Sequence, residues 1–113
     1  MKIVSRGDVY FCWGSPGTVG CEERKTRPVI IVQNDVGNSK SQTTIAVPLT
    51  SNTDRRPYPM QFYVQIPGRQ PSRALCDQIM TIDKRRLLDK VYRLTNRELQ
   101  QLDHCLKVSL GLQ

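Results

Sequence analysis

Two side chains, Arg27 and Thr50, offer the chemistry that this sequence most readily places together. A guanidinium is a permanently charged fork of N–H donors that matches the oxygens of a phosphate or a carboxylate. A threonine hydroxyl can donate a further hydrogen bond to the same oxygens. Arg27 stands at the start of one β-rich run and Thr50 at the end of the next, so the two meet only if these runs pair. The alternative is that Arg27 is a solvated charge at the end of a strand.

The two runs predict an antiparallel hairpin. Residues 29–32 are four consecutive β-branched apolar residues, which is typical of a strand buried on both faces. Residues 43–50 form the second run, and residues 35–39 between them have the composition of a loop. Symmetric pairing places Arg27 opposite Thr50, on the same face and about 5 Å apart at Cβ. It gathers a predicted core on the other face: Ile30, Val32, Ile45, Val47 and Leu49.

The charge of the chain predicts a polyanionic or acidic partner. The net charge is +7 on 113 residues, a length that favours one domain over residues 1–113. The basic residues cluster along the sequence: Arg24, Lys25 and Arg27; Arg55 and Arg56; Arg69 and Arg73; Lys84, Arg85, Arg86, Lys90 and Arg93. Nucleic acid or an acidic protein segment would suit such clusters. The alternative is that they only keep the surface soluble.

The cysteines and the single histidine argue against metal or thiol chemistry. Four cysteines form no C-x-x-C pair, so they are expected to be free thiols acting as small apolar groups. A zinc site using His104 would need ligands from unrelated segments, and Cys21 lacks a nearby histidine as a base. No apolar run reaches membrane-spanning length and the N-terminus lacks a signal-peptide pattern, so we expect no metal, no cofactor, no membrane and a cytoplasmic location.

The remaining segments predict short strands closed by one helix. Strands are expected at residues 8–13 and 61–66, short β pieces within 72–81, and a helical turn at 82–87. Residues 14–23 read as a loop. Many short strands followed by a helix indicate an α+β, mainly β fold: a small, strongly bent barrel or sheet with a C-terminal helix.

The start of that helix is well marked. Thr95 and Glu98 match a capping box, and Leu94 and Leu99 are placed as its hydrophobic staple. Gly111 can end the helix in the left-handed conformation. One apolar stripe follows the helix: Leu99, Leu102, Leu106 and Leu110. The helix is therefore expected to cover the barrel or to form an interface with a partner.

Five blocks of the sequence carry a resemblance to a known family. They are residues 6–10 (RGDVY), 25–29 (KTRPV), 33–38 (QNDVGN), 48–51 (PLTS) and 76–84 (CDQIMTIDK). In this order and spacing, and together with the terminal helix, they resemble the MazF/PemK toxin family. The resemblance implies a small SH3-like barrel with a closing helix, a fold shared with the gyrase poison CcdB.

The resemblance also implies an activity and partners. Members are homodimeric, sequence-specific endoribonucleases, the toxins of type II toxin–antitoxin pairs. They cleave single-stranded mRNA without a metal ion, through attack of the ribose 2′-OH to give a cyclic phosphate. A cognate antitoxin inhibits them with an acidic C-terminal segment. Two alternatives remain open: a CcdB-like gyrase poison without chemistry, and an inactive RNA-binding module.

The resemblance assigns roles to individual residues. Arg27 and Thr50 match the family's catalytic pair, and Glu22 matches the acidic residue of its first loop, which makes it the candidate base. The expected RNA-binding residues are Trp13, Lys25, Ser51, Arg55, Arg56, Asp77 and Gln78. Trp13 is expected to stack on a base, and Asp77 and Gln78 to read base edges, because single-stranded RNA is recognised in these ways.

Overall fold

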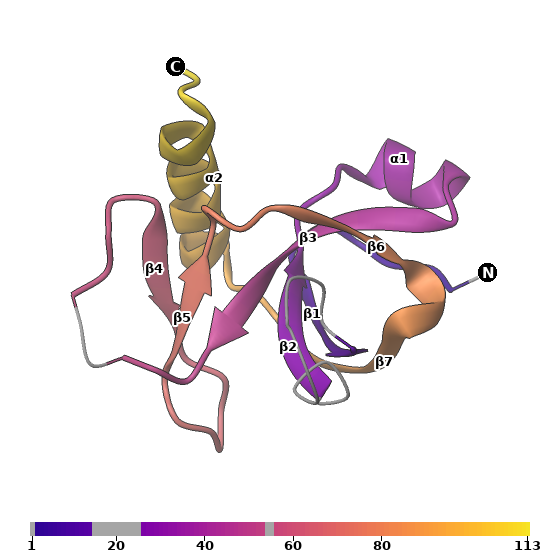
Figure 1. Cartoon of the computed structure of the whole chain (residues 1–113), viewed down its shortest axis with the longest axis horizontal. Coiled ribbons are helices and arrows are strands. Elements are labelled where there is room, and N and C mark those ends of the chain that lie inside the picture. The colour runs from indigo at the N-terminus through magenta and orange to yellow at the C-terminus, as the bar shows by residue number, and fades with distance from the viewer. Residues whose placement is uncertain (1, 15–25, 54–55) are drawn as a thin grey trace.

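Seven antiparallel strands and a long C-terminal helix make up most of the described chain (Figure 1). The computed structural model describes residues 2–14, 26–53 and 56–113. The strands are β1 (Asp8–Trp13), β2 (Thr26–Ile31), β3 (Thr43–Thr50), β4 (Gln61–Val64), β5 (Ser72–Leu75), β6 (Met80–Asp83) and β7 (Leu87–Arg93). The helices are α1 (Asp35–Lys40), the 3₁₀ turn η2 (Lys84–Arg86) and α2 (Asn96–Leu110).

The strands are ordered β4-β5-β3-β2-β1-β7, and β6 also pairs with β3. The long strand β3 joins the parts of the sheet, because β6 pairs with its first half and β5 with its last two residues. The described strands form a bent sheet that does not close, with β4 and β7 at the ends of the path. The predicted class, mainly β with a C-terminal helix, is confirmed.

The predicted β2–β3 hairpin is confirmed in its register. Val29 lies opposite Pro48, Ile30 opposite Val47 and Ile31 opposite Ala46. The same register, continued to the ends of both strands, places Arg27 opposite Thr50. The open end of this hairpin therefore carries the two side chains whose meeting the sequence predicted.

The hairpin is buried on both faces, as its apolar run predicted. One face joins a cluster that contains Ile30, Val32, Val47 and Leu49, with Ile45 packed against it. The other face joins a second cluster that contains Val29, Ile31 and Ala46. Because packed cores on both sides restrict the hairpin, the side chains at its open end are held on a rigid support.

Helix α2 covers the first of these cores beside β4 (Figure 1). Thr95 and Glu98 form the predicted capping box, and Gly111 ends the helix at a φ of 70°. Leu102 is fully buried, whereas Leu110, at the end of the stripe, is 57% exposed. None of the helices in the described ranges combines the length and the apolar character needed to cross a membrane.

Residues 35–39, predicted as a loop, belong to helix α1 instead. The Asn34 side chain caps this helix by accepting a hydrogen bond from the Gly37 N–H at 2.8 Å. Asn38 is buried, where its Nδ2 donates to the Gln33 carbonyl oxygen at 2.9 Å and its Oδ1 accepts from the Thr44 hydroxyl at 2.7 Å. These polar contacts stabilise a short helix that its turn-forming residues do not predict.

Strand β7 was not predicted at all. Its residues Leu87–Arg93 include Asp89, Lys90 and Arg93 and do not alternate between apolar and polar side chains. The strand pairs with β1 through two register shifts. Strand β7 therefore owes its conformation to pairing with β1, which a local sequence pattern does not reveal.

The described cysteines are buried free thiols, as predicted. Cys12, Cys76 and Cys105 lack a disulfide, and Cys21 lies outside the described residues. Burial raises the pKa of the Cys76 thiol to about 12. In the described part of the chain, no group of three or more His, Cys, Asp or Glu side chains could hold a metal ion.

Candidate active site

A cleft of about 730 Å³ lies at the open end of the β2–β3 hairpin. The residues lining it are Phe11, Thr26, Arg27, Pro28, Leu49, Thr50, Ser51, Gly68, Arg69, Gln70 and Ser72. Three residues predicted from the sequence, Arg27, Thr50 and Ser51, are among them. The structure therefore brings the predicted catalytic pair and one predicted RNA-binding residue to a single cleft.

The pair belongs to a row of side chains that runs across five strands. Cys12 on β1 lies opposite Arg27, and Arg27 lies opposite Thr50 by continuation of the hairpin register. Thr50 lies opposite Arg73 on β5, and Arg73 lies opposite Tyr63 on β4. Directly opposed residues share a face of the sheet. We call these five residues the cross-strand row, and the Thr50 hydroxyl lies in it between two arginines.

Both arginines of the row contain a buried N–H without a partner. Among the described residues, the Nε atoms of Arg27 and Arg73 are inaccessible to solvent and have no hydrogen-bond acceptor. An unsatisfied buried donor costs roughly 1–3 kcal/mol, and the cost is greater for a charged group. A bound anion would offset this cost through its attraction to the two guanidinium charges.

Other cations of the described chain are neutralised away from the cleft. Arg93 and Lys90 both pair with Asp8, at 2.9 and 3.2 Å. Arg6 pairs with Asp103, and Arg85 with Asp83. None of the ion pairs within the described residues involves Arg27 or Arg73. Within the described residues, the charge of these two arginines is therefore not paired with a carboxylate.

The Thr50 hydroxyl is oriented by the turn that follows β3. Its Oγ1 accepts a hydrogen bond from the Asn52 N–H at 3.2 Å. A hydroxyl has one donor hydrogen besides its acceptor lone pairs. Because Thr50 accepts from the backbone, its O–H hydrogen can be donated to an oxygen in the cleft.

Arg69 and Phe11 form a second basic feature of the cleft, which the sequence did not predict. The Arg69 guanidinium carbon lies 4.7 Å from the centre of the Phe11 ring. The loop carrying Arg69 is fixed by Gln65, whose Nε2 donates to the Arg69 carbonyl oxygen at 2.8 Å. Arg69 belongs to a basic cluster in the sequence. That cluster does not predict a contact with Phe11, which lies on β1, 58 positions earlier in the chain.

Four of the expected RNA-binding residues that the structure describes lie outside the cleft lining, and Trp13 and Arg56 are two of them. Trp13 is half-exposed at the end of β1, opposite the cleft residue Thr26, and its carbonyl oxygen accepts from Arg86 Nε at 2.9 Å. Trp13 therefore lies beside the cleft. Arg56 is exposed and does not line it. Glu22, Lys25 and Arg55 fall outside the described residues.

Asp77 and Gln78 are not brought to the cleft within one chain. They lie in the turn after β5, where Asp77 Oδ1 accepts from Gln61 Nε2 at 3.1 Å. Asp77 follows Arg73 by four positions, which is about 13 Å at most even if the chain were extended. Within one chain, Asp77 and Gln78 therefore do not line the cleft that contains Arg27 and Thr50.

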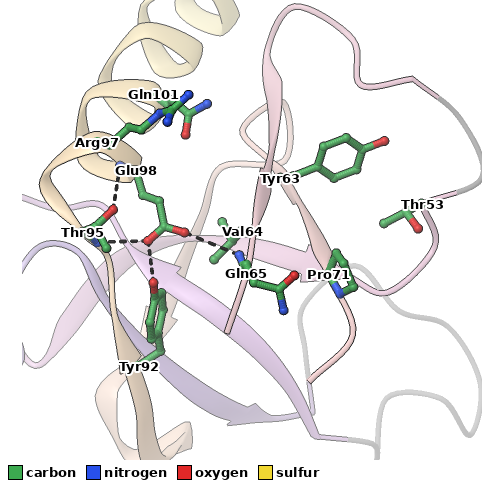
Figure 2. A pocket seen from close by; sticks show the side chains of 10 residues that line it. All are labelled: Thr53, Tyr63, Val64, Gln65, Pro71, Tyr92, Thr95, Arg97, Glu98 and Gln101. Atoms are coloured by element: carbon green, nitrogen blue, oxygen red, sulfur yellow. Dashed lines mark hydrogen bonds between the residues drawn. The ribbon is translucent and has the colours of Figure 1, made fainter. Parts of the chain in front are cut away.

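A second hollow, of about 680 Å³, lies between β4 and the start of α2 (Figure 2). Its carboxylate, Glu98, accepts from the Tyr92 hydroxyl at 2.7 Å, from the Thr95 N–H at 2.9 Å and from the Gln65 N–H at 3.4 Å. Burial and the hydrogen bond to Glu98 raise the pKa of Tyr92 to about 12. The hydrogen bonds of Glu98 hold α2 against the sheet, whereas the arginines of the cross-strand row keep unsatisfied donors. We therefore take the cleft as the candidate active site.

Comparison with known proteins defines the class to which this fold and cleft belong. The model of the family described as "PemK-like, MazF-like toxin of type II toxin-antitoxin system" matches residues 5–110. The chain therefore belongs to the PemK/MazF family of toxins.

Particular relatives are similar over nearly the whole chain. Endoribonuclease EndoA of Bacillus subtilis (strain 168) is 40% identical over 115 residues, covering 97% of each chain. A solved endoribonuclease from a mycobacterial species is 26% identical, with a TM-score of 0.80 over 99% of this chain and 95% of that one. An endoribonuclease in complex with its cognate antitoxin, also mycobacterial, is 27% identical, with a TM-score of 0.79 over 97% of both chains.

Proposed function

We propose that this endoribonuclease toxin cleaves single-stranded mRNA at short specific sequences, without a metal ion, and leaves a cyclic phosphate. The observation that carries the proposal is the shared position of Arg27 and Thr50 in one cleft, on one face of a buried hairpin. The 40% sequence identity to a protein named an endoribonuclease, over 97% of both chains, also supports the proposal.

The mechanism assigns one task to each group. The ribose 2′-oxygen attacks the adjacent phosphorus, the new bond closes a 2′,3′-cyclic phosphate, and the bond to the 5′-oxygen breaks. A base accepts the 2′-OH proton, and an acid supplies a proton to the leaving 5′-oxygen. Arg27 stabilises the charge that develops on the phosphorane oxygens, because its charge is permanent and its donors fit phosphate. Thr50 and Ser51 donate hydrogen bonds to the same phosphate, and Glu22 is our candidate for the base.

Recognition of the RNA requires residues beyond the pair. Trp13, at the edge of the cleft, offers an exposed ring for stacking on a base. Lys25, Arg55 and Arg56 are proposed to bind the backbone phosphates. Asp77 and Gln78 do not line the cleft of their own chain, which suits a homodimer in which each protomer reads bases for the partner's cleft.

Exposed apolar side chains at the end of α2 support the homodimer. Val108, Leu110 and Leu112 are 39%, 57% and 60% exposed. A cognate antitoxin with an acidic C-terminal segment is the proposed inhibitor. Its carboxylates could accept hydrogen bonds from the same basic side chains that bind RNA phosphates. We place the toxin in the cytoplasm, where mRNA is available.

The test is to map the ends produced from a long defined RNA in excess EDTA. We expect breaks at one short sequence, with cyclic phosphate at the new 3′ ends. Arg27→Ala is expected to lower the cleavage rate by about 100-fold or more, because it removes the main stabilisation of the transition-state charge.

Circular dichroism and thermal unfolding of Arg27→Ala are the control for folding. A folded Arg27→Ala variant with full activity would refute the catalytic role of Arg27. RNA that is bound by the wild-type protein yet left whole would refute the nuclease assignment and favour an inactive binding module.

A further inference from the structure

Arg73, which has no role in the mechanism proposed above, resembles Arg27 in having an Nε atom that is buried and, within the described chain, unpaired. The Nε atoms of both residues are buried without an acceptor among the described residues. Arg73 lies directly opposite Thr50 on β5, while Arg27 lies opposite Thr50 on β2. In the strand order β5-β3-β2, Thr50 therefore lies between the two arginines, with Arg27 and the Arg73 neighbour Ser72 lining the cleft.

This order of side chains suits a single anion that is bound from both sides of Thr50. An arginine side chain is long enough for two guanidiniums on such a row to converge on an oxyanion above the threonine. Without an anion the two positive charges repel each other, and each keeps an unpaired buried donor. A phosphate diester placed over Thr50 would accept hydrogen bonds from the two guanidiniums and neutralise the repulsion.

The row continues from Arg73 to an exposed aromatic ring. Tyr63 lies directly opposite Arg73 on β4 and is 44% exposed. Figure 2 shows its ring pointing away from α2, toward Thr53. Directly opposed side chains lie about 5 Å apart at Cβ, so a base on this ring would belong to a nucleotide next to a phosphate at Arg73.

Building on the proposed function, we propose that Arg73 and Tyr63 form a nucleotide subsite beside the scissile bond. Arg73 binds the same phosphate as Arg27 from the opposite side, and the Tyr63 ring stacks on the adjoining base. Arg73 is then a second catalytic arginine, because its guanidinium touches the group whose charge increases in the transition state. Stacking on Tyr63 fixes that nucleotide without selecting its identity, since every base has a π face.

The test measures single-turnover cleavage of a short RNA that contains the mapped sequence. Arg73→Ala is expected to lower the rate by about 100-fold, and Arg73→Lys to recover part of the loss. Arg73→Met, which keeps the apolar stem without the charge, should match Arg73→Ala and covers the case in which alanine impairs folding. Arg85→Ala is the matched control: it removes one charge from a side chain that is 89% exposed in η2, and we expect it to change the rate by less than about twofold.

Tyr63 is tested against the base that it is proposed to hold. Tyr63→Ala should weaken binding of an uncleavable 2′-deoxy RNA by about tenfold, whereas Tyr63→Phe should bind like the wild type. In two further RNAs the base on one or the other side of the scissile phosphate is removed. One of these RNAs should bind equally well to the wild type and to Tyr63→Ala.

The outcomes separate this inference from the proposed function. If Arg27→Ala is inactive while Arg73→Met and Arg73→Ala cleave like Arg85→Ala, the second catalytic arginine is refuted and the nuclease assignment stands. If Tyr63→Ala shows the same loss on every RNA, the stacking contact is refuted. If the wild-type protein leaves RNA whole, the proposed function itself fails.

Discussion

A single threonine lies where two arginines and a backbone turn meet. Thr50 accepts from the Asn52 N–H and lies between Arg27 and Arg73 in the cross-strand row. The Thr50 oxygen therefore accepts a hydrogen bond from the backbone, and its O–H hydrogen is left for a ligand. This arrangement gives Thr50 a role that depends on its oxygen and not on its size.

Thr50 variants separate these two properties. Thr50→Val keeps the shape and the strand preference of threonine but removes the donor, so we expect cleavage to slow by about 100-fold. Thr50→Ser keeps the donor and should retain most of the activity. Single-turnover rates on the same RNA, with thermal unfolding to confirm folding, make the comparison. Equal rates for the two variants would contradict a hydrogen bond from Thr50 to the phosphate.

The placement of Arg27 and Thr50 at one end of a hairpin could be predicted from the sequence, and the rest of the row could not. Arg27 and Thr50 flank one hairpin whose β-branched runs determine its register. Arg73 and Tyr63 reach the row through strands separated from β3 by a long connection, and no local pattern sets the β3–β5 register. Asp77 and Gln78 matched the family by sequence alone, and the structure places them away from the cleft.

At the scale of elements, prediction succeeded where the signal is local. The capping box of α2 and the 3₁₀ turn at Lys84–Arg86 each follow from a few neighbouring residues. Helix α1 and strand β7 do not, because buried amide contacts of Asn38 hold the first and pairing with β1 holds the second. Tertiary contacts decided the conformation in both cases.

The Tyr92–Glu98 contact links β7 to the start of α2, and we predict that its contribution to stability depends on pH. Folding raises the pKa of Tyr92 from 10.0 to about 12. The stabilisation from this contact is thus fully present below pH 10 and is lost as the pH rises from 10 through 12. Tyr92→Phe should lower the free energy of unfolding at pH 7 by about 1 kcal/mol and lose less stability than the wild type between pH 10 and 12.

Urea unfolding of both proteins from pH 7 to 12, in reductant, provides the measurement. Tyr58→Phe, at a tyrosine that is half-exposed, is the matched control. An identical alkaline decline in the wild type and in Tyr92→Phe would show that the hydrogen bond to Glu98 does not stabilise the junction of β7 and α2.

At the scale of the molecule, the positive charge is divided between structure and ligand. Arg6, Arg85, Lys90 and Arg93 form ion pairs within the described chain. Arg27 and Arg73 take part in none of these pairs. The net charge of +7 favours association with polyanions, and Arg27 places one charge in the cleft that no carboxylate of the described chain neutralises.

The central claim is that Arg27 and Thr50 hold one scissile phosphate between them. A structure of the protein bound to its target RNA, with hydrogen replacing the reactive 2′-OH, tests this most directly. We predict a single phosphate whose oxygens accept hydrogen bonds from the Arg27 guanidinium and the Thr50 hydroxyl. An RNA bound with that phosphate elsewhere, and with neither group within hydrogen-bond distance of it, would contradict the account.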